Sequence, residues 1–485
     1  MHLLVLLHDF IHARVNEKGC RIAGWMRVCF AALFLMDRLL LGLDLSLFYV
    51  APSPLVTLDP SEKFWTLFRY YNPHEDATVL WIMHYTGLAQ GVLLLLGVAP
   101  RFQMAGLLFH LVCFENHSPL LWDGQDAMFK TWALLFLFLP LHHVTIFGRR
   151  YNSINANKNQ LSWPMWPFRV WQIYMTLVYL GASVGKLQAT NVWVGKEANA
   201  LYNGIHLNDV YPGIWNPEIL FNRIGPLKVM TWTAIAIEAA CGWTIWMPGL
   251  RTITLVLVFL LHIGIDITMN MHCFEWLTLI GWCVFLVQPT QTRMTTTTST
   301  ITSKATSPQT SSSVSVTTTT TTTTITTTRT GRFRKVLDTI IFTLLVAIFV
   351  VDIIPIGDIS KMCPTMVQPY TEALEKIRDQ LASTEIMTKL GEYGLITQGP
   401  WDMFSEPADE NRYWKGIVHK YDGSVEVWKT PDWKDMTPWQ HKRHVRLIAY
   451  YDTLSDEGAE YGQVSLAVYI ISLYHPGVVS LELIR

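Results

Sequence analysis

The chain has 485 residues, of which 50% are hydrophobic and 12% aromatic, and only 15% carry a charge, against roughly 25% in ordinary soluble domains. This balance excludes a purely soluble protein and predicts a polytopic membrane protein with some soluble mass attached. The formal net charge of -1, with no basic arm or basic helix, argues against nucleic acid as a partner.

Apolar runs of about 20 residues, the length that crosses a bilayer, recur along the chain. They predict a polytopic α-helical membrane protein with about nine spans, near residues 24–43, 77–98, 102–116, 126–145, 165–186, 228–248, 252–268, 271–289 and 336–356. The N-terminal apolar run precedes its basic residues and lacks a convincing cleavage site, so we expect it to lie along the membrane interface rather than act as a signal peptide.

Basic residues set the expected orientation of these spans. With the N-terminus in the cytoplasm, most loop lysines and arginines fall on the cytoplasmic side, as the positive-inside rule requires. An odd number of spans then places the C-terminal part outside the cytoplasm. We therefore expect an integral membrane protein of the endoplasmic reticulum or another endomembrane, with its C-terminal part in the lumen.

Composition divides the chain into four parts: a membrane domain (1–290), a Thr/Ser-rich linker (291–335), a further membrane helix (336–356) and a small α+β extramembrane domain (357–485). The linker has no residues to bury and is predicted to be disordered. In the last part, alternation around Tyr421-Asp422-Gly423 predicts a hairpin. A helix is predicted near 372–390, and helical periodicity returns near 439–451 and 461–473.

Lys186 lies at the far end of the apolar run 165–186. An amine at the edge of the hydrocarbon is costly, so ionisable residues within spans are candidate functional residues. The alternative is that the side chain only extends its ammonium to the headgroups. An amine held in an apolar wall is expected to have a lowered pKa and to serve as a general base near neutral pH.

Other ionisable residues fall at similar depth, on the outer side of the predicted spans. They are Asp37 and Arg38 in the first span, His84 in the second, Asp126 and Lys130 in the fourth, and His262 and Asp266 in the seventh, with His117 in the loop before the fourth. We expect them to line one lumen-facing polar chamber together with Lys186. Glu238 lies deepest, in the middle of the sixth span, and must be protonated, paired or facing water.

Two pairs in this set share a helix face because their members are four residues apart. Asp126 is expected to partner Lys130. His262 is expected to partner Asp266. The alternative for each pair is mutual neutralisation that helps a span to insert. A neutral histidine near Lys186 could orient a substrate oxygen or stabilise developing negative charge.

The segment VYLGASVGKL, followed by Trp193-Val194-Gly195, resembles the corresponding segment of the vitamin K-dependent gamma-glutamyl carboxylases and of the broader horizontally transferred transmembrane (HTTM) domain family. The resemblance covers about residues 20–290. It extends to Asn116-His117-Ser118, to His262 upstream of Cys273-Phe274 and Trp276, and to Arg27 with Asp37, Arg169 with Gln172, and Glu238. The GPWDMFSEP turn and the hairpin after it resemble the tail of many family members.

The resemblance implies a lyase-like enzyme in which Lys186 deprotonates vitamin K hydroquinone or a related quinol, with His117 and His262 needed for the oxygen chemistry. O2 and CO2 would be co-substrates, no metal is expected, and a glutamate in a lumenal peptide, or a small acid, would be carboxylated. Carboxylases tend to have two adjacent lysines where this chain has Gly185-Lys186, and their soluble domain is longer. Quinol oxidation alone, or chemistry on a smaller acid, therefore stays open.

Two readings from other classes compete with this one. A non-catalytic membrane scaffold or assembly factor would keep the fold and present the C-terminal domain in the lumen. A histidine-box di-iron oxidase is suggested by His8 with His12 and by His142-His143, but the further boxes that such an enzyme needs are absent from the sequence. Cys273 and Cys363 could form a disulfide in an oxidising lumen.

Overall fold

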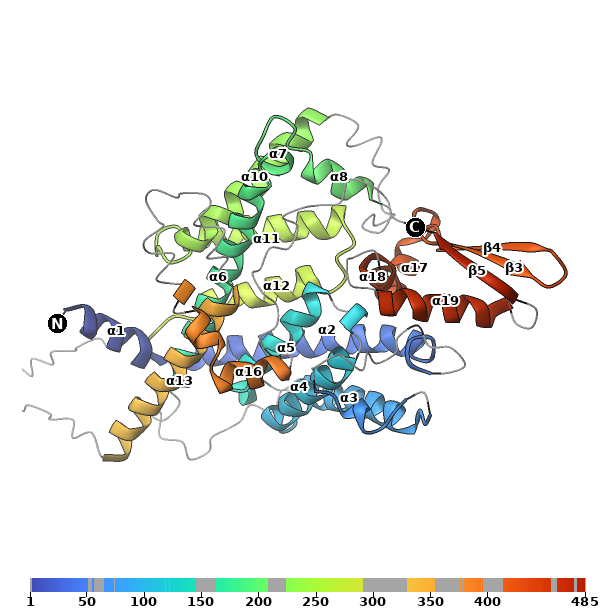
Figure 1. Ribbon diagram of the computed structural model, residues 1–485. Helices are drawn as coiled ribbons and strands as arrows, with labels where there is room; N and C mark the ends of the chain where they lie inside the picture. The colour runs from blue at the N-terminus through green and yellow to red at the C-terminus, as the bar shows by residue number, and fades with distance from the viewer. Residues whose placement is uncertain are drawn as a thin grey trace, which may run out of the picture.

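The computed structural model shows a mostly helical protein with two small sheets (Figure 1). It describes residues 2–50, 55, 65–73, 75–117, 119–121, 123–144, 163–207, 224–290, 329–353, 375–376, 378–393, 395, 413–454, 460–474 and 478–484. The proposed partner Cys363 of Cys273, most of the Thr/Ser-rich linker and the GPWDMFSEP turn lie outside the described residues.

The elements follow one another in this order. They are α1 (His2–His12), β1 (Arg14–Val15), α2 (Glu17–Tyr49), η1 (Leu67–Arg69), α3 (Thr78–Leu96), α4 (Pro100–His117), η2 (Pro119–Leu121), α5 (Gly124–Phe136), η3 (Leu141–His143), β2 (Trp163–Pro164), α6 (Trp166–Gln188), α7 (Thr190–Trp193), α8 (Ala200–His206), α10 (Ile224–Thr244), α11 (Arg251–Thr268), α12 (Phe274–Trp282), η4 (Cys283–Leu286), α13 (Arg329–Ile353), α16 (Glu385–Glu392), β3 (Lys415–Lys420), β4 (Val425–Lys429), η5 (Trp433–Asp435), α17 (Pro438–Arg443), α18 (Val445–Thr453), α19 (Glu460–Tyr474) and β5 (Val478–Ile484).

A helix occupies each of the nine predicted spans, so the helical character of these segments is confirmed. Two of the helices are shorter than predicted, α5 and α12, and α13 begins at Arg329 rather than at 336. Within the described ranges, two helices, α3 and α11, are long and apolar enough to cross a membrane by length and composition. That is weak evidence for a membrane protein, and it does not confirm nine spans.

Helix α2 is the longest element, with 33 residues and a length of about 50 Å. It begins at a capped end, because the Asn16 side chain accepts a hydrogen bond from the Gly19 backbone N–H at 3.0 Å, which satisfies one of the unpaired donors of the first turn. Chain segments far apart in the sequence pack along it, among them α3, α12 and η3.

Helices α5, α6 and α12 meet in a core of large aromatic side chains. Trp132, Trp171 and Trp282 are fully buried there, and the Trp132 and Trp171 ring centroids lie 5.5 Å apart. Gly281 permits this close approach: a Cβ at that position would lie 2.7 Å from the Met175 sulfur and 2.8 Å from Trp132. Most of α12 is therefore enclosed by other helices, although it is predicted as a span.

The N-terminal elements pack beside α6 and α13. His12 Nε2 lies 3.1 Å from the Thr339 hydroxyl of α13, and β1 pairs with β2 in antiparallel register. The Tyr174 ring of α6 contacts the Phe349 ring of α13 at 4.8 Å. Figure 1 shows α1 and α13 together at one end of α2.

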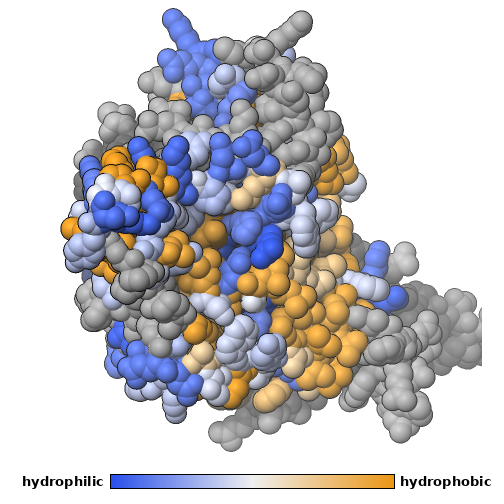
Figure 2. Space-filling model, turned by 90° about the vertical axis from the view of Figure 1, so that its right-hand side faces the viewer, coloured by the Kyte–Doolittle hydropathy of each residue, from blue (hydrophilic) through white to orange (hydrophobic). Residues whose placement is uncertain are grey.

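Helix α11 exposes mainly apolar side chains, unlike a surface helix of a soluble protein, which exposes polar ones. Its buried side chains are those of Thr254, Val258 and His262, whereas most of its exposed side chains are large and apolar. These apolar residues are Ile253, Val256, Leu257, Leu260, Ile263 and Ile267. Helix α3 behaves similarly, since His84 is buried and Ile82 is exposed. Figure 2 shows a broad apolar area low on one face of the molecule.

The C-terminal part is a small α+β unit, as the sequence predicts. Strands β4, β3 and β5 form an antiparallel sheet in that order, and α19 packs on it. The predicted hairpin turn is confirmed: Gly423 adopts φ +80°, and Asp422 accepts a hydrogen bond from the Ser424 N–H at 2.9 Å. Strand β5 is not predicted by the sequence.

This unit shares a hydrophobic core with the helical body. Leu45 and Phe48 from the last turns of α2 belong to the same buried cluster as Trp414, Tyr450 and Leu466 of the C-terminal unit. Figure 1 shows that unit at the end of α2 opposite to α1. The C-terminal unit is therefore packed onto the helices rather than tethered beside them.

Candidate functional site

Helix α6 presents Tyr179 and Lys186 on its buried face. They are seven residues apart, two helical turns, so their side chains lie one above the other. Between them, the Ser183 hydroxyl is occupied by a bond to its own helix, donated to the Tyr179 carbonyl at 2.7 Å. Both functional side chains are buried, Tyr179 with 5% and Lys186 with 5% of their surface exposed.

Lys186 forms a close ion pair with Glu238 of α10. Its Nζ lies 2.7 Å from Glu238 Oε1 and 2.6 Å from Oε2, which is the length of a charge-assisted hydrogen bond. The Trp193 ring adds a cation–π contact, with Nζ 5.1 Å from its centroid. The sequence requires Glu238 to be protonated, paired or hydrated, and the structure gives the second of these three.

Tyr179, His262 and Glu275 form a hydrogen-bonded chain across three helices. His262 of α11 bonds through Nε2 to the Tyr179 hydroxyl and through Nδ1 to the Glu275 carboxylate of α12. All three side chains are buried. A hydroxyl, an imidazole and a carboxylate in this order are the components of a proton relay.

The ion pair and the hydrogen-bonded chain belong to one site. Tyr179 lies within electrostatic range of both Glu275 and Glu238, and it shares a helix face with Lys186. We call the set Lys186, Glu238, Tyr179, His262 and Glu275 the Lys186 cluster. It draws side chains from α6, α10, α11 and α12, so it depends on the packing of four helices.

A second buried site lies where the C-terminal unit meets the helices. Arg446 of α18 reaches Asp37 of α2 at 2.8 Å and Asp126 of α5 at 2.8 Å, and it donates to the Leu121 carbonyl at 3.0 Å. Arg38 binds Asp37 at 2.9 Å. We call Asp37, Arg38, Glu115, Asp126 and Arg446 the Arg446 cluster.

Glu115 and Lys130 complete the charge pattern around this cluster. Lys130 lies 3.3 Å from Glu115, and Arg38 lies 3.7 Å from Glu115. Three positive side chains, Arg38, Lys130 and Arg446, thus face three carboxylates, those of Asp37, Glu115 and Asp126. The expected Asp126–Lys130 partnership is replaced: Asp126 binds Arg446, and Lys130 binds Glu115.

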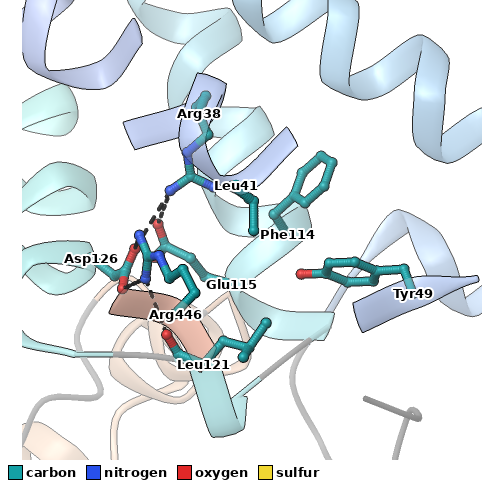
Figure 3. Close-up of a pocket in the computed structure, with 8 residues that line it drawn as sticks. All are labelled: Arg38, Leu41, Tyr49, Phe114, Glu115, Leu121, Asp126 and Arg446. Carbon is teal, nitrogen blue, oxygen red and sulfur yellow. Dashed lines mark hydrogen bonds and ion pairs between the residues drawn. The ribbon is translucent and has the colours of Figure 1, made fainter. Parts of the chain in front are cut away.

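Figure 3 shows a pocket at the edge of the Arg446 cluster. Arg38, Glu115, Asp126 and Arg446 form its polar side, and apolar and aromatic side chains form the other. The Tyr49 hydroxyl points into it.

The pKa values of two groups outside the predicted spans follow from this environment. Burial alone acts to lower the pKa of Arg446, but the carboxylates of Asp126 and Asp37 outweigh it and hold that pKa well above its ordinary value. Burial, assisted by the charge of Asp126, raises the pKa of Asp123 to about 8. Asp123 therefore keeps its proton at neutral pH.

The residues predicted from sequence divide between these two sites. Lys186, Glu238 and His262 come together in the Lys186 cluster. Asp37, Arg38 and Asp126 belong to the Arg446 cluster, and Lys130 binds its Glu115. The single chamber that we expected is thus divided into two groups. The start of α12 and the residues just before it touch both, because His272 lies 3.3 Å from Asp37 and Glu275 binds His262.

His117 lies at the Arg446 side. Its ring stacks on Tyr49 with a centroid distance of 5.3 Å and meets Phe68 edge-on at 5.1 Å. Asp266 is only half-buried, and in the described part of the chain the ion pair of His262 is made with Glu275 rather than with Asp266. The structure therefore brings neither of these two predicted residues to Lys186.

Sequence reasoning missed Tyr179, Glu275, Glu115 and Arg446. For Glu275 a signal was present, because it is an acid within the otherwise apolar run 271–289, and such a residue needs a partner. Tyr179 carries no signal beyond its spacing from Lys186. Arg446 lies 409 positions from Asp37, so no local pattern could have joined them.

Two groups of histidines bear on the di-iron alternative. The rings of His8 and His12 lie 4.7 Å apart, and those of His142 and His143 lie 4.3 Å apart. Within the residues that the structure describes, no group of three or more His, Cys, Asp or Glu side chains is placed to hold a metal ion.

With this geometry, the chain defines a helical protein with two buried charged clusters. No protein-family model, curated protein or solved structure matches it. The resemblance to the carboxylases therefore stays a prediction, and the function is argued from the site.

Proposed function

We propose that this chain is an integral membrane enzyme that deprotonates a lipid quinol, of the vitamin K-dependent carboxylase and epoxidase type. The observation that carries the proposal is the Lys186 cluster itself. A buried ammonium–carboxylate pair lies beside a buried tyrosine–imidazole–carboxylate chain. Buried acid–base groups of this kind are costly for stability and typical of sites that move protons.

The outer surface supports a membrane location. In α11, Leu260 is 61% exposed and His262 is 5% exposed. A helix that turns its apolar side outward and its polar side inward loses free energy in water and gains it in lipid. We propose the endoplasmic reticulum or another endomembrane, with the N-terminus in the cytoplasm and the C-terminal unit in the lumen.

The residues present fit a quinol in their donor and acceptor chemistry. A phenolic hydroxyl can donate to the Glu238 carboxylate, its anion can be held by the Lys186 ammonium, and the Trp193 ring lies beside the amine. With O2, reduced vitamin K would supply the strong base that removes a proton from a glutamate-like substrate, to which CO2 adds. Apolar walls matter here because water would quench such a base.

The role expected for Lys186 changes in one respect. The sequence predicts an isolated amine in an apolar wall, whereas the amine has a carboxylate partner at 2.6 Å. Its Nζ donates to both oxygens of that carboxylate, which is the geometry of an ammonium–carboxylate ion pair. Lys186 therefore fits the holding of an anion better than the removal of a proton by a free amine.

The test uses microsomes that contain the chain, reduced vitamin K and labelled bicarbonate. We expect both the 2,3-epoxide and fixed label, and at least tenfold less of each for Lys186→Ala. Lys228→Ala is the matched control, because Lys228 lies on α10 but is only half-buried and bonds to the Lys196 carbonyl. Absence of both products from the parent chain would reject the proposal, while epoxide without label would restrict it to quinol oxidation.

The Arg446 cluster favours a second candidate, a non-catalytic scaffold that presents the C-terminal unit. Four residues that were predicted to line the chamber lie here instead. Asp37 and Asp126 bind Arg446 of that unit, and Arg38 and Lys130 form ion pairs with Asp37 and Glu115. A scaffold predicts that Lys186→Ala and His262→Ala leave the cellular phenotype unchanged, while truncation after Pro355 abolishes it.

A further inference from the structure

The two hydrogen bonds of His262 fix which ring nitrogen carries the proton. An ionised carboxylate only accepts hydrogen bonds, so Nδ1, which faces Glu275, carries the hydrogen. Nε2 is then free to accept from the Tyr179 hydroxyl. Tyr179 can therefore pass its proton to His262, and Glu275 stabilises the imidazolium that results.

Lys186 is arranged for a different task. Its Nζ is held by both oxygens of Glu238, so the positive charge is fixed in place. Glu238 is the most exposed side chain of the two ion pairs in the cluster, at 11%, against 6% for Lys186 and for His262 and 2% for Glu275. A substrate oxygen that arrives there meets a fixed positive charge with Tyr179 behind it on the same helix face.

Resting on the function proposed above, we propose that the base of this site is the chain Tyr179–His262–Glu275, with Lys186 as the charge that holds the substrate anion. The substrate O–H bond breaks and its proton joins the Tyr179 oxygen, while the Tyr179 proton moves to His262 Nε2. No electrons are exchanged in this step. The products are a phenolate opposite the Lys186 ammonium and an imidazolium opposite the Glu275 carboxylate.

Glu275 is a positioning residue in this scheme, because it acts through His262. Its role can be measured without any turnover by nitrogen NMR of the chain labelled with 15N-histidine in lipid nanodiscs. The His262 signals are assigned by their loss in His262→Gln. We expect the parent to carry its proton on Nδ1 and Glu275→Leu to shift the population toward Nε2. Glu275→Asp, which keeps a carboxylate, should restore the Nδ1 form at least in part.

Asp266→Asn is the matched control for that measurement. Asp266 is the acid four residues from His262 that the sequence predicts as its partner, and the structure places Glu275 there instead. The His262 signals should therefore be unaffected by Asp266→Asn. An unchanged tautomer in Glu275→Leu, or a shift caused by Asp266→Asn, overturns the inference.

Measurements of quinol turnover distinguish the residues that act as the base from Lys186, which holds the substrate anion. We expect Tyr179→Phe and His262→Gln to lower the rate of epoxide formation by about 100-fold, and Lys186→Arg, which keeps a positive charge but cannot act as a base, to stay within about tenfold of the parent. Loss of turnover in Lys186→Arg with retention in Tyr179→Phe would assign the base to Lys186. If the parent oxidises no quinol, the proposed function fails, while the NMR comparison still accepts or rejects the relay.

Discussion

Lys186 and Arg446 are both buried cations, but they contact their carboxylates in different ways. Among the residues that the structure describes, Lys186 pairs with one carboxylate, that of Glu238 on a neighbouring helix. Arg446 contacts Asp37 and Asp126 on two helices and the Leu121 carbonyl as well, an arrangement that suits the five donors of a planar guanidinium. The second arrangement fastens the C-terminal unit to two helices of the body.

The Arg446 contacts predict a large effect on stability. Arg446→Met leaves the Asp37 and Asp126 carboxylates buried without this partner, which costs about 3–5 kcal/mol. Arg443→Met is the matched control: its guanidinium lies 3.9 Å from Asp44 and is 44% exposed, so we expect a change of about 1 kcal/mol or less. Thermal unfolding in detergent measures both. Equal losses in the two variants would contradict the structural role of Arg446.

Asp123 predicts a pH dependence with a definite sign. The pKa of Asp123 in the folded protein is raised to about 8, above its value of about 4 in the unfolded chain. Protonated Asp123 therefore makes its full contribution to the free energy of folding below about pH 4, and that contribution is lost as the pH rises through 8. Asp123→Asn removes the titration and keeps the N-cap of α5, since Asn caps as well as Asp. We expect the two proteins to melt alike at pH 4 and the variant to be more stable at pH 8.5. A constant difference across this range would refute the assignment.

At the residue scale, the sequence predicted which residues are unusual better than it predicted their partners. Lys186, Glu238 and His262 stand out because each is ionisable within an apolar run, and all three lie in one cluster. Their contacts are set by helix rotation and by tertiary packing, which the spacing of residues in the sequence does not reveal. The i,i+4 spacing predicted Asp266 as the partner of His262, whereas the partner in the structure is Glu275 of the neighbouring helix α12.

At the scale of elements, α11 carries the argument for a membrane. We predict that Leu260→Asp lowers the membrane-integrated fraction of the chain, because an aspartate facing lipid at mid-helix costs about 2.5–3.5 kcal/mol. Val464→Asp in α19 is the matched control, since Leu260 and Val464 are both 61% exposed and α19 belongs to the C-terminal unit. Carbonate extraction of microsomes measures the integrated fraction. A loss in neither variant would place α11 in water.

The elements themselves were largely predictable because length and hydrophobicity are local properties. Each apolar run forms a helix, and the hairpin at Gly423 follows from its turn residues. The failures are the elements whose identity depends on neighbours. Strand β5 exists because β3 offers it a paired edge, β1 and β2 are two residues each, and α5 ends at Phe136 although the apolar run continues.

On the scale of the whole molecule, α2 separates the end that contains α1 and α13 from the end that contains the C-terminal unit. Helices α1 and α13 pack near the start of α2, and the C-terminal unit packs on its last turns (Figure 1). Asp44, near the end of α2, faces His444 at 3.8 Å. The N-terminus and the C-terminal unit are thus separated by a helix of about 50 Å, which exceeds the roughly 30 Å of a hydrocarbon core.

This separation predicts that the two ends lie on opposite sides of the membrane. Arg14, Lys18 and Lys335 belong to the α1 and α13 end, and basic residues favour the cytoplasmic side. In intact microsomes, protease should therefore remove an N-terminal tag and spare a tag at the C-terminus until detergent opens the vesicles. Arg446→Met provides a further comparison, because a C-terminal unit released from α2 remains in the lumen and should stay protected even though it unfolds more easily. Digestion of the C-terminal tag in sealed vesicles would reverse the proposed orientation.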